Sequence, residues 1–137
     1  MNELLNLAIA ALLFLLLDLG WFSLSLNAIY IPVINQVQGS AIQMSLLKQR
    51  WWGGLIAWCL LALGVVVFVL PLARKSLLKL VAYGAVYGLI VYGVFNWTNF
   101  VMFNNYNNWK VIVPDLLWGV FVCTVVSVIM GKALSLK

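Results

Sequence analysis

The chain has 137 residues, of which 66% are hydrophobic and only 8% are charged, whereas a soluble globular domain carries roughly 25% charged residues. This composition excludes a water-soluble fold, and the length allows a single domain, residues 1–137. The net charge of +5 comes from eight basic residues against three acids. Because these basic residues lie at predicted helix ends and in loops, they indicate topology and lipid contact, and we expect no nucleic-acid binding.

Four apolar segments are each long enough to cross a bilayer, which takes about 20 helical residues. The sequence therefore predicts an all-α integral membrane protein, a four-helix transmembrane bundle in the plasma membrane or a bacterial inner membrane. The predicted spans are residues 4–26, 51–73, 80–103 and 112–131. The first span has no Lys or Arg ahead of it and continues past Asp18, which favours a retained helix over a signal peptide.

The basic residues set the predicted orientation. With the N-terminus and C-terminus both inside, the inner side holds more Lys and Arg than the outer side, as the positive-inside rule requires. The inner residues are Arg74, Lys75, Lys79, Lys132 and Lys137, and the outer ones are Lys48, Arg50 and Lys110. We expect Arg74, Lys75 and Lys79 to contact anionic lipid head groups.

Residues 27–50 form the longest connection. Pro32 and Gly39 are expected to break it, and Ile42, Leu46 and Leu47 give part of it an amphipathic pattern. We predict that this segment lies on the outer membrane surface, as an interfacial helix or a cap over the bundle.

Polar residues recur at one depth of the predicted outer leaflet. Asp18 lies ~12 Å below the outer end of its helix, and Asn96 and Asn99 lie ~10 and ~6 Å below theirs, at 1.5 Å per residue. Since ionisable groups in a membrane are costly, we predict a binding pocket there. Its expected residues are Asp18, Trp21, Asn96, Thr98, Asn99, Asp115 and Trp118, with Lys48 and Arg50 as counter-ions.

Five of these residues also have a purely structural explanation. The helix that holds Asp18 could be shorter than predicted, which would place this acid near water. Asp115 follows Pro114, a pair that suits the first turn of a helix. Asn96, Thr98 and Asn99 are also residues that hold helices together by hydrogen bonds worth ~1 kcal/mol each.

Small residues predict close helix packing at Gly84, Gly88 and Gly119, within the monomer in preference to a dimer seam. Histidine is absent, and Cys59 and Cys123 lie within apolar segments. We therefore predict no metal site and no cofactor.

The ordered motifs resemble a family of predicted four-helix membrane proteins, domain of unknown function 2177. The matching residues are Leu17-Asp18-x-x-Trp21, Tyr30, Pro71, Gly84-x-x-x-Gly88-x-x-x-Tyr92, Thr98-Asn99, Trp109 and Asp115-x-x-Trp118-Gly119. The resemblance covers residues 13–127 and implies the same fold and the same polar positions, without implying a reaction. The family has an acid two residues before Thr-Asn, where this chain has Asn96, which argues against a relay of three carboxylates.

Three functions remain open at this point. The first is a small channel or transporter component whose pocket binds a proton, a cation or a small polar solute, which would need a homo-oligomer or a membrane partner to enclose a pore. The second is a structural or accessory subunit. The third is a lipid-modifying enzyme using Asp18 and Asp115, which ranks last because the sequence shows no evident nucleophile.

Overall fold

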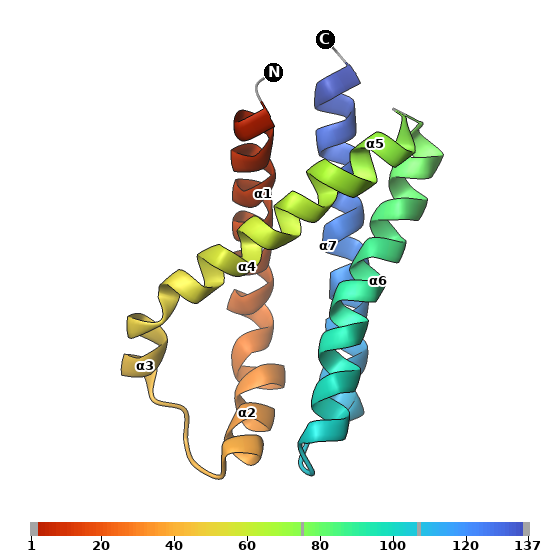
Figure 1. Cartoon of the computed structure of the whole chain (residues 1–137). Coiled ribbons are helices and arrows are strands. Elements are labelled where there is room, and N and C mark those ends of the chain that lie inside the picture. The colour runs from red at the N-terminus through yellow and green to blue at the C-terminus, as the bar shows by residue number, and fades with distance from the viewer. Residues whose placement is uncertain (1–2, 75, 107, 136–137) are drawn as a thin grey trace.

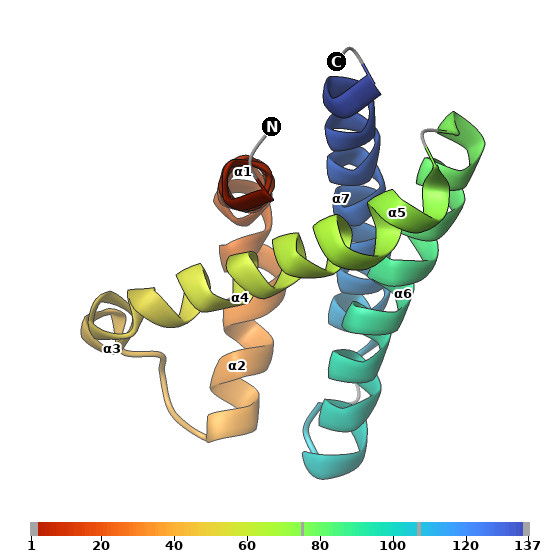
Figure 2. The same ribbon diagram turned by 45° about the horizontal axis from the view of Figure 1, so that its top comes forward.

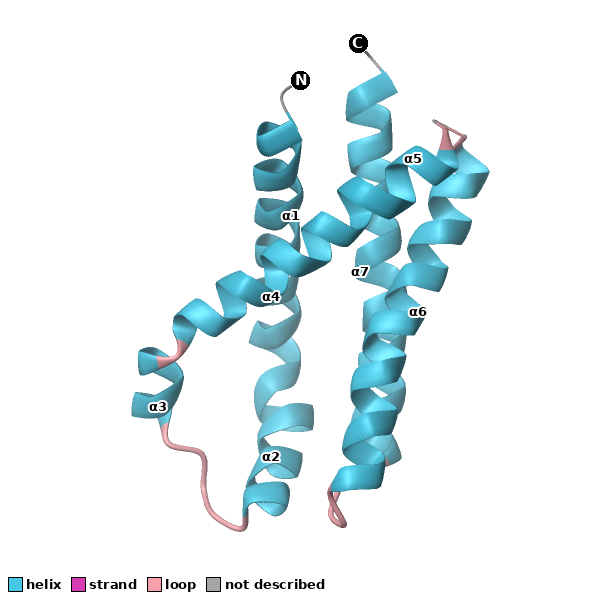
Figure 3. Ribbon diagram, in the orientation of Figure 1, coloured by secondary structure: helices cyan, strands magenta, loops and turns pink. Residues whose placement is uncertain are grey.

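A computed structural model describes residues 3–74, 76–106 and 108–135, so Lys75 and Lys137 of the predicted inner side lie outside the described residues. The described part is built of helices joined by short turns (Figure 3). Their bounds are α1 (Glu3–Ser25), η1 (Leu26–Tyr30), α2 (Ile31–Gln38), α3 (Met44–Gln49), α4 (Trp51–Gly64), η2 (Val65–Val69), α5 (Leu70–Ala73), α6 (Leu77–Met102) and α7 (Trp109–Ser135). The labels η1 and η2 denote single π-helical turns.

Four helical rods are long and apolar enough to span a membrane, as the sequence predicted. They are Glu3–Gln38, Trp51–Ala73, Leu77–Met102 and Trp109–Ala133. Large apolar side chains on them point outward, with Leu24 81% and Val101 82% exposed. Because these helices satisfy their own backbone hydrogen bonds, such surfaces are stable against acyl chains, and the protein is a multi-pass membrane protein.

The first helix is longer than predicted. From the sequence we predicted that this span ends at residue 26 and that Pro32 breaks the helix. In the structure the helix continues to Gln38 and ends at Gly39, whose φ of 71° is left-handed. Pro32 is tolerated because it follows a π turn, in which Ile31 N–H donates to Leu26 O and the hydrogen-bond register shifts. Within residues 27–50, α2 is thus the end of the first helical rod, and α3 is a separate short helix whose side chains are exposed. The placement of this segment on the outer membrane surface stays a prediction.

Pro71 is accommodated within a helical rod in the same way as Pro32, after a π turn. Pro71 follows the π turn η2, where Leu70 N–H donates to Val65 O. The rod formed by α4, η2 and α5 runs obliquely across α1 and across the α6–α7 pair (Figures 1 and 2). This crossing places different parts of one span against α1 and against α6 and α7.

Helices α6 and α7 form a closely packed antiparallel pair (Figure 1). A Cβ atom at Gly88 would overlap the backbone of Gly119, and one at Gly84 would lie 2.9 Å from Ser127 Oγ. A Cβ atom at Gly119 would in turn overlap the side chain of Tyr92. The three glycines that the sequence singled out for packing therefore all lie on the seam between α6 and α7.

The main apolar core lies toward the end of the bundle that holds the two termini. It includes Ala10 and Phe14 of α1, Val65 of η2 and Val122 and Met130 of α7. Because this core uses the N-terminal half of α1 and the C-terminal half of α7, the carboxylates Asp18 and Asp115 lie nearer the opposite end.

Candidate functional site

Asp18 is held between two tryptophans. It lies on α1 and is only 5% exposed. The indole Nε1 of Trp58, on α4, donates to Asp18 Oδ2 at 2.7 Å, and that of Trp118, on α7, donates to Asp18 Oδ1 at 2.7 Å. One carboxylate thus joins three spans.

Asp115 has its own pair of donors. It lies on α7 and is 7% exposed. Tyr30 Oη donates to Asp115 Oδ1 at 2.7 Å, and Asn96 Nδ2 donates to Asp115 Oδ2 at 2.6 Å. Asn96 is fully buried, and its Oδ1 accepts a hydrogen bond from Tyr106 Oη at 2.9 Å. The second carboxylate therefore joins the first, third and fourth spans.

The two carboxylate sites are connected by a tryptophan stack. The rings of Trp21 and Trp118 lie 4.8 Å apart at an angle of 7°, and Trp21 Nε1 donates to Tyr30 Oη at 2.9 Å. The sequence Asp-x-x-Trp thus occurs once on α1 and once on α7. The two segments lie side by side in opposite directions, with their tryptophan rings stacked. Each acid precedes its stacked tryptophan by three residues, and α1 and α7 run in opposite directions. The Cα atoms of Asp18 and Asp115 are therefore about 9 Å apart along the bundle axis.

Asp115 is not the start of its helix, which removes one of the structural explanations offered by the sequence. Helix α7 begins at Trp109, and the cap is Asn108, whose Oδ1 accepts a hydrogen bond from Lys110 N at 2.9 Å. Pro114 lies inside the helix. Asp115 therefore has no capping role, and its carboxylate is turned into the bundle.

The predicted counter-ions lie elsewhere. Arg50 lines a small surface pocket together with Gln38 and Leu47, between α2 and α3. Across the part of the chain that the structure describes, no ion pair joins a Lys or Arg to Asp18 or Asp115. Both carboxylates are bound by neutral hydrogen-bond donors only.

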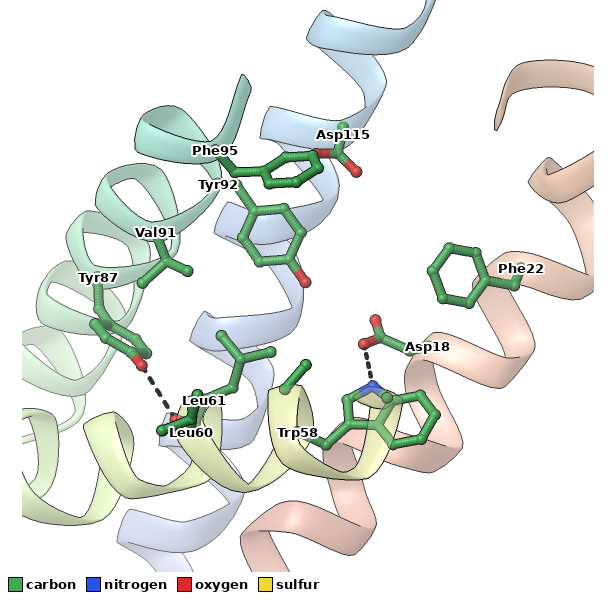
Figure 4. A pocket seen from close by; sticks show the side chains of 12 residues that line it. Asp18, Phe22, Trp58, Leu60, Leu61, Tyr87, Val91, Tyr92, Phe95 and Asp115 are labelled. Carbon is green, nitrogen blue, oxygen red and sulfur yellow. Dashed lines mark hydrogen bonds between the residues drawn. The ribbon is translucent and has the colours of Figure 1, made fainter. Parts of the chain in front are cut away.

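Both acids line a cavity of about 560 Å³ between α1, α4, α6 and α7, which we call the intramembrane cavity. Its other lining residues include Phe22, Trp58, Tyr92 and Phe95. Figure 4 shows Asp18 and Asp115 approaching the cavity from α1 and α7, with the hydroxyl of Tyr92 directed into it from α6. Such a cavity, largely apolar with a few convergent polar groups, has the character of a small-molecule site.

The structure brings together five of the seven residues predicted to bind: Asp18, Trp21, Asn96, Asp115 and Trp118. It separates the other two from them. Thr98 lines a shallow apolar groove on the outer face of α6, and Asn99 is half-buried and makes no hydrogen bond to either carboxylate. For Thr98 the reason is helical phase, since this residue lies about 200° around α6 from Asn96.

Sequence reasoning missed Trp58, the hydrogen bond from Tyr30 to Asp115, and the position of Tyr92 at the cavity. Trp58 is surrounded by apolar residues on its own helix, and its indole N–H is the signal that could have identified it. A buried indole N–H needs an acceptor, and the nearest acceptors in a span of such composition are carboxylates on other helices.

The Tyr106 hydroxyl, which lies in the turn between α6 and α7, gives a measurable pH dependence. Burial, and then the nearby Asp115 carboxylate, raise the pKa of Tyr106 from 10.0 to about 12. Because the folded state holds this proton more tightly, its contribution to stability is complete below pH 10 and is lost as the pH rises toward 12.

We expect the difference in absorbance at 295 nm between the wild type and Tyr106→Phe to titrate near pH 12 in the native protein and near pH 10 after denaturation. A midpoint near pH 10 in the native protein would contradict the burial of this hydroxyl.

Residues 4–131 match the family model described as predicted membrane protein, DUF2177. The chain belongs to this family. The match to the DUF2177 family confirms the resemblance of the motifs, and it includes parts of all four spans and every residue of the hydrogen-bonded network. No curated protein and no solved structure gives a significant match to this DUF2177 chain.

Among the described residues of this DUF2177 member, His, Cys, Asp and Glu side chains form no group of three that could ligate a metal ion. The two acids instead offer separate anionic acceptors at the edge of an apolar space.

Proposed function

We propose that the protein binds an organic cation with an apolar body in the intramembrane cavity, and that it serves as the substrate-binding component of a small transporter. The observation that carries this proposal is that Asp18 and Asp115 both line one aromatic cavity and neither is paired with a cation among the described residues.

The charge of the site supports a cation as the ligand. Two carboxylates within a membrane are costly unless a positive charge accompanies them for part of the working cycle. The hydrogen bonds to each acid occupy one acceptor site on each oxygen, and a carboxylate has about four such sites. A cation can therefore approach either acid without displacing an indole, hydroxyl or amide.

The walls of the site support an apolar body on that cation. Phe22, Trp58, Tyr92 and Phe95 present aromatic rings or ring edges around the cavity, and ring faces attract cations, especially where water is scarce. Leu60 and Phe95 are exposed on the membrane-facing surface, at 61% and 58%. This exposure is consistent with entry of an amphipathic ligand from the lipid.

A pair of ions with one shape and opposite charge tests the proposal. Tetraphenylphosphonium should bind the purified protein in lipid nanodiscs and quench its tryptophan fluorescence, whereas tetraphenylborate should not. Asp115→Asn should weaken tetraphenylphosphonium binding by roughly tenfold or more, since two unit charges about 6 Å apart interact by ~3 kcal/mol at an effective dielectric constant of about 20.

A matched pair of variants tests whether the organic cation binds in the intramembrane cavity, without removing any hydrogen bond of the network. Ala57→Phe would fill the cavity that Ala57 lines and should abolish binding. Ile56→Phe adds a comparable ring on the neighbouring exposed position, which does not line the cavity, and should bind normally. Equal binding of both ions, or equal loss in both variants, would refute the assignment.

Proteoliposomes test the transport role. We expect uptake of tetraphenylphosphonium that depends on Asp115 and is blocked in Ala57→Phe. Binding without any uptake would restrict the protein to a receptor or an accessory subunit.

The second candidate is a structural subunit. The observation that favours it is that every oxygen of the two carboxylates already accepts a hydrogen bond from another helix segment. On this alternative, substitutions at Asp18 and Asp115 lower stability, and no organic cation binds the wild type. The nanodisc titration therefore separates the two functions.

A further inference from the structure

Asn27 is a polar residue on the outer surface of the first span. It lies in the π turn η1, and its side chain is exposed. Its amide makes no hydrogen bond to any residue that the structure describes. Because an amide carries both donors and an acceptor, its contact with acyl chains is costly unless another polar group covers it.

The depth of Asn27 in the membrane follows from the contacts on either side of it. Six residues earlier on the same rod, Trp21 stacks on Trp118 of α7. Three residues later, Tyr30 donates to Asp115 of α7. Both contacts on α7 lie about 9–14 Å along the helix from its first residue. Since the hydrocarbon layer is about 30 Å thick, Asn27 lies within it and not at the head groups.

The backbone carbonyl of Asn27 also lacks its α-helical donor. In an α-helix this oxygen would accept a hydrogen bond from Ile31 N–H, but in the π turn Ile31 N–H donates to Leu26 O. The next residue is Pro32, which has no N–H to donate. Asn27 therefore presents a donor and two kinds of acceptor at one point of the lipid-facing surface.

The face of α1 that carries Asn27 is shaped for another helix. Four residues on it point within about 40° of the direction opposite Asp18, at 100° per residue. Their spacing of four, three and four residues is that of the seam of a two-stranded coiled coil. They are Leu16, Gly20, Ser23 and Asn27. A Cβ atom at Gly20 would meet nothing within 4 Å, so a second helix can approach closely there.

We propose that this face of α1 binds the same face of a second copy of the chain within the membrane. Two copies inserted in the same direction have parallel α1 helices, and a twofold axis along the membrane normal places Asn27 beside the partner's Asn27. Each amide then donates to the other and accepts from it, which an acyl chain cannot do. A single asparagine in such a seam also fixes the register of the two helices and favours a dimer.

Förster energy transfer in liposomes tests the association of the full chain. Copies labelled at the N-terminus with a donor or an acceptor dye are mixed over a series of protein-to-lipid ratios. We expect the wild type to form dimers and Asn27→Leu to weaken the association by roughly tenfold or more. The variant should fold at least as well as the wild type, because it removes an uncovered amide from the lipid. Asn27→Gln keeps a donor and an acceptor and should retain most of the association.

A matched pair of glycine variants tests the close approach of the two helices. Gly20→Leu would hold the α1 helices apart and should also weaken the association by roughly tenfold or more. Gly53→Leu adds the same side chain on α4, at another exposed glycine where a Cβ would meet nothing within 4 Å. This control should associate as the wild type does.

Three outcomes would overturn the proposal. The first is a wild type that stays monomeric at the highest protein density, and the second is unchanged association of Asn27→Leu. The third is an equal loss in Gly20→Leu and Gly53→Leu. None of these residues lines the intramembrane cavity, so tetraphenylphosphonium binding should persist in every variant. This proposal and the proposed function can therefore fail separately.

Discussion

Replacing Asp18 by asparagine should lower the free energy of unfolding by about 3 kcal/mol, and by clearly more than the same change at Asp115. Both Asp18 oxygens accept hydrogen bonds from indole N–H groups, and an indole can only donate. The amide nitrogen of asparagine would therefore face one of these donors with a second donor, whichever way it turned.

The environment of Asp115 is more adaptable. The Tyr30 hydroxyl can rotate and accept a hydrogen bond instead of donating one, because a hydroxyl is both donor and acceptor. Asparagine at position 115 can thus keep its oxygen toward Asn96 and turn its nitrogen toward Tyr30. We expect Asp115→Asn to cost about 1 kcal/mol.

Thermal unfolding in a mild detergent, followed by tryptophan fluorescence, measures both effects. In the double variant Asp18→Asn with Trp58→Phe, the phenyl ring removes one of the two opposing donors. The two changes should therefore cost about 1 kcal/mol less together than the sum of their separate costs. If the two losses of stability simply add, or if Asp115→Asn is the more damaging substitution, Asp18 is not held by hydrogen bonds from both indoles.

Gly88→Ala should be nearly as damaging, at about 3 kcal/mol, because it forces a methyl group into a closely packed seam. The added Cβ would overlap the backbone carbonyl of Gly119, and its other near neighbour is Val120 Cα. Neither atom belongs to a flexible side chain, so α6 and α7 would have to separate. That separation would also move Trp118 away from Asp18, since Trp118 precedes Gly119 on the same helix.

A glycine in open space provides the control. Gly20 lies on α1, and a Cβ there would meet nothing within 4 Å. Gly20→Ala should therefore leave stability unchanged or raise it by up to about 1 kcal/mol, because alanine is the better helix former. Equal melting temperatures for Gly88→Ala and the wild type would contradict the close packing of α6 against α7 at Gly88.

The two pockets divide the bundle by chemistry. The intramembrane cavity combines two acids with aromatic walls, whereas a second pocket is lined by Glu3, Asn6 and Arg74. The oblique rod of α4, η2 and α5 lines both of them, with Trp58 at one and Pro71 at the other. One span therefore forms part of the wall of both pockets.

The sequence by itself determined the fold class, the number of spans and the choice of Asp18 and Asp115 as the residues to explain. These follow from local quantities, because the length of an apolar run sets whether it crosses a bilayer and an acid within it is costly whatever surrounds it. The Gly84 and Gly88 spacing likewise predicted close helix contact from the chain alone.

Only the tertiary structure decided which groups meet. Trp58 and Trp118 are 60 residues apart, yet they bind the two oxygens of one carboxylate, and Tyr30 reaches Asp115 across 85 residues. Such pairings depend on the crossing angle and rotation of each helix, which arise from packing summed over many side chains and not from any local pattern. For the same reason Thr98 turned outward, and Pro32 continued a helix that composition alone would have ended.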